Sequence, residues 1–144
     1  MLICDLLSNQ VVVSADAQQT VLHAARMMVD HNIGAVPVLE HGRLVGIFTE
    51  RDLMSRVVVA GRDPANTLIR EVMTDDPMVV RPDDSLETCM TLMRRHGFRH
   101  LLIGNGLELR GVVSLRDVLL HDLDAKDDEV RMMRAYLHST PEAS

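Results

Sequence analysis

Apolar residues recur at helical spacing in two places along the chain. Residues 21, 24, 25 and 28 lie at the i, i+3, i+4 and i+7 positions of one helix face, and residues 86, 89, 90 and 93 repeat the same spacing. Thr20 and Ser85 stand directly before these stretches, where a hydroxyl can accept a hydrogen bond from a backbone amide at a helix start. The pattern predicts one amphipathic helix in each half of the chain.

Shorter apolar runs surround each predicted helix and indicate strands. After the helix come two runs separated by a turn, at His41-Gly42 in the first half and at Asn105-Gly106 in the second. Before it comes one short run, "VVV" at 11–13 or "MVV" at 78–80. Each half is therefore expected to contain a strand, a helix and a hairpin in that order.

One short stretch of the chain is duplicated closely. "GIFTERD" at 46–52 returns 65 residues later as "GVVSLRD" at 111–117, with Gly, a hydroxyl and an Arg-Asp pair in the same places. A second helix is expected to begin at Thr49 and at Ser114, because a hydroxyl followed three residues later by an acid is typical of a helix N-terminus. The motif recurs at the same offset as the predicted helices and hairpins, which indicates an internal duplication.

The duplication predicts a mixed α/β (α+β) fold of two β-α-β-β-α repeats. Neither repeat, at about 60 residues, would bury its apolar strands well alone, so we expect the two to pack face to face about a pseudo-twofold axis. The stretch "AGRDPANT" at 60–67 is the natural connection. The expected boundaries are 1–64 for the first repeat, 65–124 for the second, and 125–144 for a C-terminal helix and tail.

The residues after Asp117 have no counterpart in the first half. Apolar residues continue to Leu137 with acids between them, which predicts a longer final helix, with Asp124 as the place where it could break. This extension is expected to be either a cap on the fold or an element that binds a partner.

The composition of the chain argues against some classes of binding partner. The formal net charge is −6 and only 2% of residues are aromatic, which opposes a nucleic acid or an anionic membrane as the main partner. The basic residues are arginines apart from Lys126, and arginine suits bidentate contacts to carboxylate or phosphate. A basic leader followed by a long apolar run is absent from the N-terminus, so we expect a soluble cytoplasmic protein.

The sequence carries little sign of catalysis. The seven histidines and two cysteines lack the spacing of metal ligands, and no phosphate-binding loop or nucleophile elbow is present. Cys89 falls on the apolar face of a predicted helix and is expected to be a small buried hydrophobe. We therefore expect a protein that is not an enzyme.

The duplicated motif and its surroundings resemble a known repeat. The motif reads G-h-h-[ST]-x-x-D, where h is apolar, and it is joined by "VPV" at 36–38 and by "REVMTDDPMVV" at 70–80. Together these features, over residues 3 to 123, resemble a tandem pair of CBS (cystathionine-β-synthase-type) domains, often called a Bateman module. The chain is similar to stand-alone proteins that consist of such a pair.

The resemblance implies a regulatory function that needs no cofactor. CBS pairs commonly bind AMP, ADP or ATP, and sometimes S-adenosylmethionine or dinucleotides such as NAD(H), in two clefts between the repeats. They typically regulate a partner protein, and many form flat homodimers. Two alternatives stay open: a structural dimerisation or interaction protein with vestigial clefts, and an enzyme subunit whose catalytic domain is a separate chain.

The hydroxyl and the acid of each motif have two interpretations. As helix caps, Thr49/Asp52 and Ser114/Asp117 would bind backbone amides. As ligand groups, the carboxylates would accept hydrogen bonds from both ribose hydroxyls, with the neighbouring hydroxyl assisting. On the residues alone capping is favoured by roughly two to one, and the family resemblance shifts the balance to ribose binding for Asp52 and Asp117.

The two repeats differ in the residues available for phosphate. By resemblance, basic residues before the "VPV"-like strand hold phosphate, and the second repeat has Arg99 and His100 there, whereas the first has Gly34 and Ala35. The Asp117 cleft is thus expected to bind phosphate better than the Asp52 cleft. Two further phosphate candidates, which could equally be solvated surface residues, are Arg51 and Arg116.

The adenine pocket follows from the resemblance alone. One cleft would be lined around Gln10-Val11 and Val36-Pro37, and the other by Asp76, Pro77 and Met78 with Leu101. Val36 and Leu101 could equally be part of the core.

Overall fold

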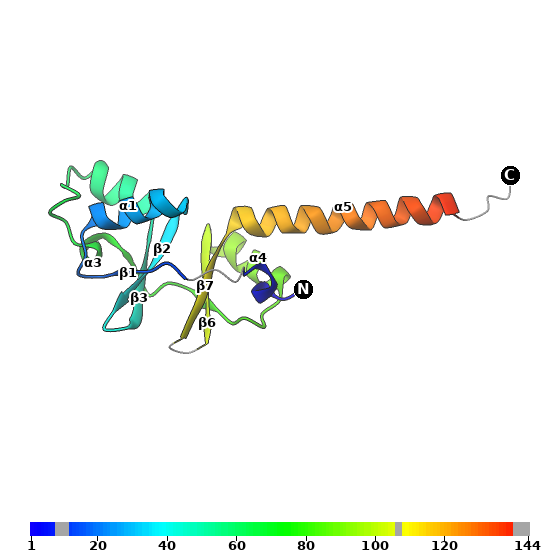
Figure 1. Ribbon diagram of the computed structural model, residues 1–144, viewed down its shortest axis with the longest axis horizontal. Coiled ribbons are helices and arrows are strands. Elements are labelled where there is room, and N and C mark those ends of the chain that lie inside the picture. Colours follow the sequence, from blue (N-terminus) through cyan, green and yellow to red (C-terminus); the bar gives the residue numbers. More distant parts are fainter. Residues whose placement is uncertain (8–11, 106–107, 140–144) are drawn as a thin grey trace.

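The computed structural model describes residues 1–7, 12–105 and 108–139. Two small sheets, each covered by helices, stand side by side, and one long helix projects from the second (Figure 1). The first sheet has the order β1-β2-β3-β4, with strands Ala15–Asp16, Ala35–Glu40, Arg43–Thr49 and Thr74–Asp75. The second has the order β5-β6-β7, with strands Val79–Val80, His100–Asn105 and Glu108–Ser114.

The helices begin where the sequence predicts. The long ones are α1 (Val21–His31), α4 (Leu86–His96) and α5 (Leu115–Ser139), and α2 (Glu50–Asp52) continues into the π-helical η2 (Leu53–Val58). The Thr20 hydroxyl accepts a hydrogen bond from the His23 amide, and the Ser85 hydroxyl accepts one from the Thr88 amide. Both predicted caps are confirmed.

The short segment that leads into each repeat packs on the other repeat. Helix η1 (Ile3–Leu6) places Ile3 in the core between α4, α5 and the second sheet. Helix α3 (Ile69–Val72) places Ile69 and Val72 in the core under α1 and the first sheet, and β4 pairs with β3. Each core is therefore built from two separate stretches of the chain, which ties the two repeats together.

A third, smaller cluster joins the two sheets. It contains two sets of residues that are 65 positions apart in the chain, Leu44 and Leu109, and Ile47 and Val112. A twofold relation between the repeats brings equivalent residues together at the axis. Ala35 and Leu102 complete this aliphatic interface.

The first strand lies later than the sequence predicts. Strand β1 is Ala15–Asp16, parallel to β2, and not residues 11–13; Val11 lies outside the described residues, and Val12 and Val13 are in no strand. Ala15 pairs with Val38 just as Val80 pairs with Ile103, which is the same offset of 65. The prediction was wrong because apolar content indicates burial, whereas the strand is defined by its hydrogen bonds to β2.

Helix α5 runs unbroken through Asp124, which corrects the suggestion of a break there. Neither glycine nor proline interrupts its 25 residues, so nothing in the sequence forces a kink. In the described part of the chain, no helix, α5 included, is both long enough and apolar enough to span a membrane.

The crossing of the repeats explains the glycine of the duplicated motif. A Cβ on Gly46 would lie 2.7 Å from the backbone oxygen of Thr74 on β4 and 2.7 Å from the Met73 sulfur. A Cβ on Gly111 would lie 2.5 Å from a methyl of Leu7, directly after η1. In both repeats the lead-in segment of the other repeat crosses close to the glycine, with backbone near Gly46 and the end of a flexible side chain near Gly111.

Candidate functional site

Both duplicated motifs face one cleft. A hollow of about 1960 Å³ lies between the repeats, and Thr49, Asp52, Ser114 and Asp117 all line it. Each motif stands where the last strand of a sheet passes into a helix, β3 into α2 and β7 into α5. The fold thus brings together the four residues predicted to bind ribose.

In the first repeat the Asp52 carboxylate is buried and hydrogen-bonded. Its Oδ2 accepts a hydrogen bond from the Thr49 amide at 3.0 Å, and the Thr74 hydroxyl donates to both oxygens at 3.2 and 3.3 Å. Arg56 Nε lies 3.8 Å from Oδ1. The residue is 6% exposed. Here the capping interpretation describes the structure, and little acceptor capacity faces the cleft.

In the second repeat the same motif leaves its carboxylate accessible. The Ser114 hydroxyl accepts from the Asp117 amide at 3.0 Å, and Asp117 Oδ2 accepts from the Ser114 amide at 3.3 Å. Asp117 is exposed. Among the described residues, the Ser114 amide is the one hydrogen-bond donor recorded for this carboxylate. Since a carboxylate has about four acceptor positions, Asp117 can still accept from both hydroxyls of a diol.

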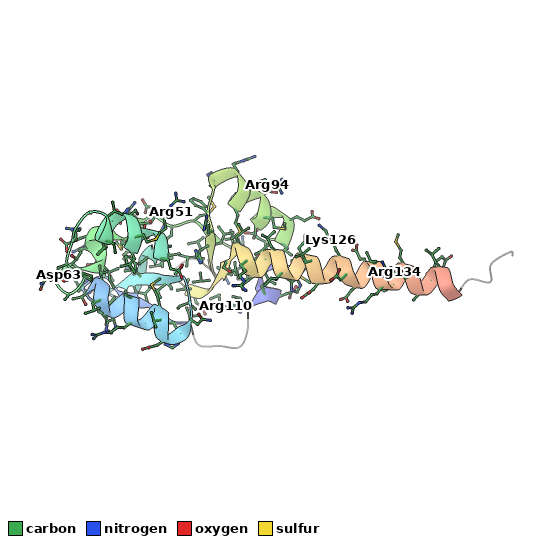
Figure 2. All side chains as sticks on the ribbon, turned by 90° about the horizontal axis from the view of Figure 1, so that it is seen from above. Arg51, Asp63, Arg94, Arg110, Lys126 and Arg134 are labelled. Atoms are coloured by element: carbon green, nitrogen blue, oxygen red, sulfur yellow. The ribbon has the colours of Figure 1, made fainter. Side chains whose placement is uncertain are left out.

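Arginine side chains line the same cleft as the accessible carboxylate. Arg99 lies just before β6 and Arg116 in the first turn of α5, and both are exposed and line the cleft. Arg51 and Arg110, labelled in Figure 2, line it as well. The guanidinium groups are fixed cations that suit bidentate contact with an anionic group such as phosphate.

His100 and Glu50 approach each other across the repeats. A Cβ on Gly34 would lie 3.0 Å from Glu50 Oε1 and 3.5 Å from His100 Nε2, so both side chains face the same backbone position. Burial lowers the pKa of His100 below its usual 6.5, while the charges of Glu50 and Asp117 act to raise it and that of Arg99 to lower it further. Burial thus favours the neutral ring although the two carboxylates favour the charged one.

This lowered pKa predicts a stability change in mild acid. Below pH 6.5 the unfolded chain binds a proton on His100 more readily than the folded chain does, so the free energy of unfolding should decrease as the pH is lowered from 6.5 through the folded pKa. His100→Gln should reduce this fall, whereas His23→Gln, an exposed control, should preserve it. Urea unfolding at pH 7.5 and 5.5 measures both; equal pH dependence in wild type and His100→Gln would contradict the prediction.

Some of the residues expected around adenine line the cleft and others lie in the cores. Asp76, Pro77 and Met78 line the cleft as they pass from the first sheet to the second. Val36 and Leu101 are fully buried in the two helix-facing cores, which differs from the expected lining, and Pro37 is buried away from the cleft. Val11 lies outside the described residues.

Strand parity is the physical reason for this difference. Successive side chains of a strand point to opposite faces, so the neighbours of the two core residues face the other way. Ala35 and Leu102 accordingly lie in the cluster between the sheets and line the cleft. The apolar wall of the site is therefore formed by residues that lie one position away from the predicted ones in strands β2 and β6.

Cys89 occupies the second core, away from the cleft. It is buried in α4, and burial, with a smaller contribution from Asp84, raises the pKa of its thiol to about 11. A thiol with so high a pKa is a poor nucleophile. The expectation of a small buried hydrophobe is confirmed.

Comparison with known families identifies the repeat. The family model of the CBS domain matches this chain at residues 3–59 and again at 69–124. The chain belongs to the CBS domain family. The two matches begin in η1 and in α3, so each CBS domain starts with the segment that packs on the other.

Relatives and solved structures share this organisation. The CBS domain-containing protein YhcV of Bacillus subtilis is 37% identical over 83% of this chain and 84% of its own length. The CBS-domain containing protein ATU1752 from Agrobacterium tumefaciens superposes with a TM-score of 0.77 at 29% identity, over 85% of this chain and 99% of that one. The CBS domain protein PAE2072 from Pyrobaculum aerophilum, complexed with AMP, gives 0.73 at 24% identity over 84% and 97%.

Two charged residues of the CBS cleft were missed from the sequence. Arg110 and Val112 are two positions apart in β7 and both line the cleft, so the alternation of side chains along a strand could have identified Arg110. Glu50 directly follows the capping hydroxyl Thr49, and no motif in the sequence distinguishes it. Its position beside His100 depends on packing between repeats, for which the sequence carries no signal.

Proposed function

We propose that this CBS pair is a regulatory module that binds an adenine nucleotide, AMP, ADP or ATP, and catalyses no reaction itself. The observation that carries the proposal is the exposed Asp117 carboxylate with open acceptor positions, in a cleft that Arg99, His100 and Arg116 also line. A carboxylate suits the ribose diol, and cations nearby suit the phosphate. Asp76 to Met78 and Leu102 would offer backbone and apolar contacts to the base.

Binding is proposed to be unequal in the two halves of the cleft. Asp52 is buried and already accepts hydrogen bonds from the Thr49 amide and the Thr74 hydroxyl, and the Glu50 carboxylate adds negative charge near Gly34. A phosphate beside Glu50 would be repelled. We therefore place one nucleotide per chain, with Ser114 and Asp117 on its ribose and Arg99, His100 and Arg116 on its phosphate.

Solved relatives make AMP the first ligand to test. PAE2072 from Pyrobaculum aerophilum is complexed with AMP, and so is CBSX2, which has a TM-score of 0.72 against this chain at 22% identity. These similarities establish the fold, and the proposal transfers the ligand class on the strength of the Asp117 site. S-adenosylmethionine and NAD(H) are the next candidates.

Calorimetry tests the function directly. The full chain is titrated with AMP, ADP, ATP, S-adenosylmethionine and NADH. Binding of at least one, near one ligand per chain, is the expected result. Failure of all five to bind would contradict the proposal and favour the second candidate, a structural interaction protein with vestigial clefts, which the long projecting helix α5 supports.

Arg99→Ala tests the phosphate contact separately. We expect AMP affinity to fall about tenfold, because a charge-assisted hydrogen bond contributes about 1.5 kcal/mol or more. Adenosine, which lacks phosphate, should bind both proteins equally. The matched control is Arg94→Ala on α4, which removes an arginine outside the cleft (Figure 2). An equal loss for adenosine would show that Arg99 acts on something other than phosphate.

Regulation requires a partner that detects the bound state. A nucleotide in the cleft would contact residues of both repeats and favour one arrangement of them, and a partner protein that binds this arrangement better would be regulated. We propose that the regulated partner is a protein and that the module acts as a homodimer.

A further inference from the structure

Helix α5 carries apolar side chains far beyond the fold. Its first turns pack on the second repeat, where Val118 is fully buried. Beyond them the helix projects away from the two sheets (Figures 1 and 2). On the projecting part, Leu123, Val130, Met133 and Leu137 are 58%, 45%, 68% and 64% exposed. Most helical stability in proteins comes from packing an apolar face, so a row of this kind indicates a missing partner surface.

The apolar row has the spacing of a coiled coil. Starting at Leu119, steps of four and three residues alternate through the positions Leu119, Leu123, Lys126, Val130, Met133 and Leu137. This is the 3-4 repeat of a two-stranded seam. Lys126 is the one polar residue of this row, and its ammonium group forms an ion pair with Asp122 at 3.0 Å. A single polar residue in such a seam is a common means of setting register.

The charges of α5 are segregated along its length. Its middle is acidic, with Asp122, Asp124, Asp127, Asp128 and Glu129, whereas Arg131 and Arg134 follow. Two parallel copies would place the acidic stretches side by side. Two antiparallel copies would place the acidic stretch of one beside Arg134 of the other, which favours association.

We infer that α5 pairs with α5 of a second copy of this chain in an antiparallel two-stranded coiled coil. In this arrangement Val130 packs against Met133 of the second copy, and twofold symmetry repeats the contact. Asp127 and Arg134 flank the seam on the same side, each following a seam position directly. In an antiparallel pair such positions face each other, so Asp127 of one copy meets Arg134 of the other twice over.

The length of the helix fits this pairing. With Val130 opposite Met133, Ser139 of one copy lies opposite Asp124 of the other, just beyond the part of α5 that packs on the second repeat. The paired part of the seam therefore runs from Lys126 to Leu137, and Leu119 and Leu123 lie nearer the fold, outside the paired part. This inference rests on the homodimer proposed above and names the surface that forms it; it is independent of nucleotide binding.

Sedimentation equilibrium of the full chain tests the pairing. We expect a concentration-dependent dimer, and Val130→Glu should raise its dissociation constant at least about 100-fold, because it buries two unpaired charges in the seam. Leu137→Glu, farther from the fold, is a second variant with the same expected direction. Asp128→Arg is the control for charge, because residue 128 lies on the face of α5 away from the seam; it should leave the dissociation constant within about threefold.

A charge exchange tests the orientation. Asp127→Arg and Arg134→Asp should each raise the dissociation constant about tenfold by creating like-charge contacts, and the double variant should restore it. Within one helix these residues are seven apart, about 10 Å along the axis, so rescue cannot come from a contact inside one chain.

Each outcome separates one step of the proposal from the others. A monomeric wild type would overturn the homodimer and the pairing together. A dimer that resists both Val130→Glu and Leu137→Glu would overturn the α5 pairing and leave the homodimer. Failure of the double exchange to rescue would overturn the antiparallel orientation. Nucleotide affinity measured by calorimetry on the same variants should not change, whichever result is obtained.

Discussion

Asp117→Ala is expected to lower nucleotide affinity by about 10- to 100-fold, because it removes a charged acceptor from two ribose hydroxyls. The same change should cost about 1 kcal/mol or less in stability, since the lost cap is exposed. Calorimetry with AMP gives the first quantity and urea unfolding the second. Asp128→Ala on α5, an acid outside the cleft, is the control and should change neither.

Asp52→Ala should give the opposite pair of results. Its carboxylate holds the Thr49 amide and the Thr74 hydroxyl in a buried setting, so its loss should cost about 2 kcal/mol of stability or more. Affinity, measured where the variant is fully folded, should fall less than in Asp117→Ala. If Asp52→Ala weakened binding more than Asp117→Ala, the asymmetry of the cleft would be assigned the wrong way round.

Gly46→Ala is expected to destabilise the protein by about 2 to 3 kcal/mol. The added methyl would lie 2.7 Å from the Thr74 backbone oxygen, and backbone in a paired strand cannot move aside cheaply. Displacing β4 would also strain the hydrogen bonds between Thr74 and Asp52. The shift in the urea midpoint, at unchanged slope, measures the effect.

Gly111→Ala supplies the matched comparison in the second repeat. Its methyl would meet the end of the Leu7 side chain, which can adopt another rotamer, so the cost should be about 1 kcal/mol or less. Equal costs at the two glycines would show that the backbone contact at Thr74 is not the source of the destabilisation. In a double-mutant cycle, Met73→Ala should recover only part of the Gly46→Ala cost, because the contact with Thr74 remains.

Much of the fold could be predicted because its signals are local. Helix faces, the hydroxyl caps Thr20 and Ser85, and the turn at His41-Gly42 depend on residues a few positions apart. The misplaced strand at 11–13 failed for the opposite reason. Strand β1 is defined by its pairing with β2, some twenty residues later, and apolar letters alone do not record that pairing.

The sequence predicted which residues form the candidate site, but not how buried or how hydrogen-bonded each of them is. Asp52 and Asp117 occupy equivalent positions in equivalent motifs, and their different accessibility is invisible in the sequence. Part of the setting of Asp52 comes from Thr74, which belongs to the segment leading into the second repeat but pairs beside the first motif. Val36 and Leu101 were expected in the cleft and lie in the cores, because one residue along a strand reverses the face.

The sequence by itself determined that the protein is a duplicate, with two capped helices, two hairpins and two helix-starting motifs in register. Those features follow from periodicity and capping, which act over a few residues. Only the tertiary structure decided that each lead-in segment packs on the other repeat, that the Asp52 carboxylate is buried while Asp117 is exposed, and that α5 leaves the fold with its apolar row exposed. These depend on contacts between residues distant in the chain, whose geometry no local pattern encodes.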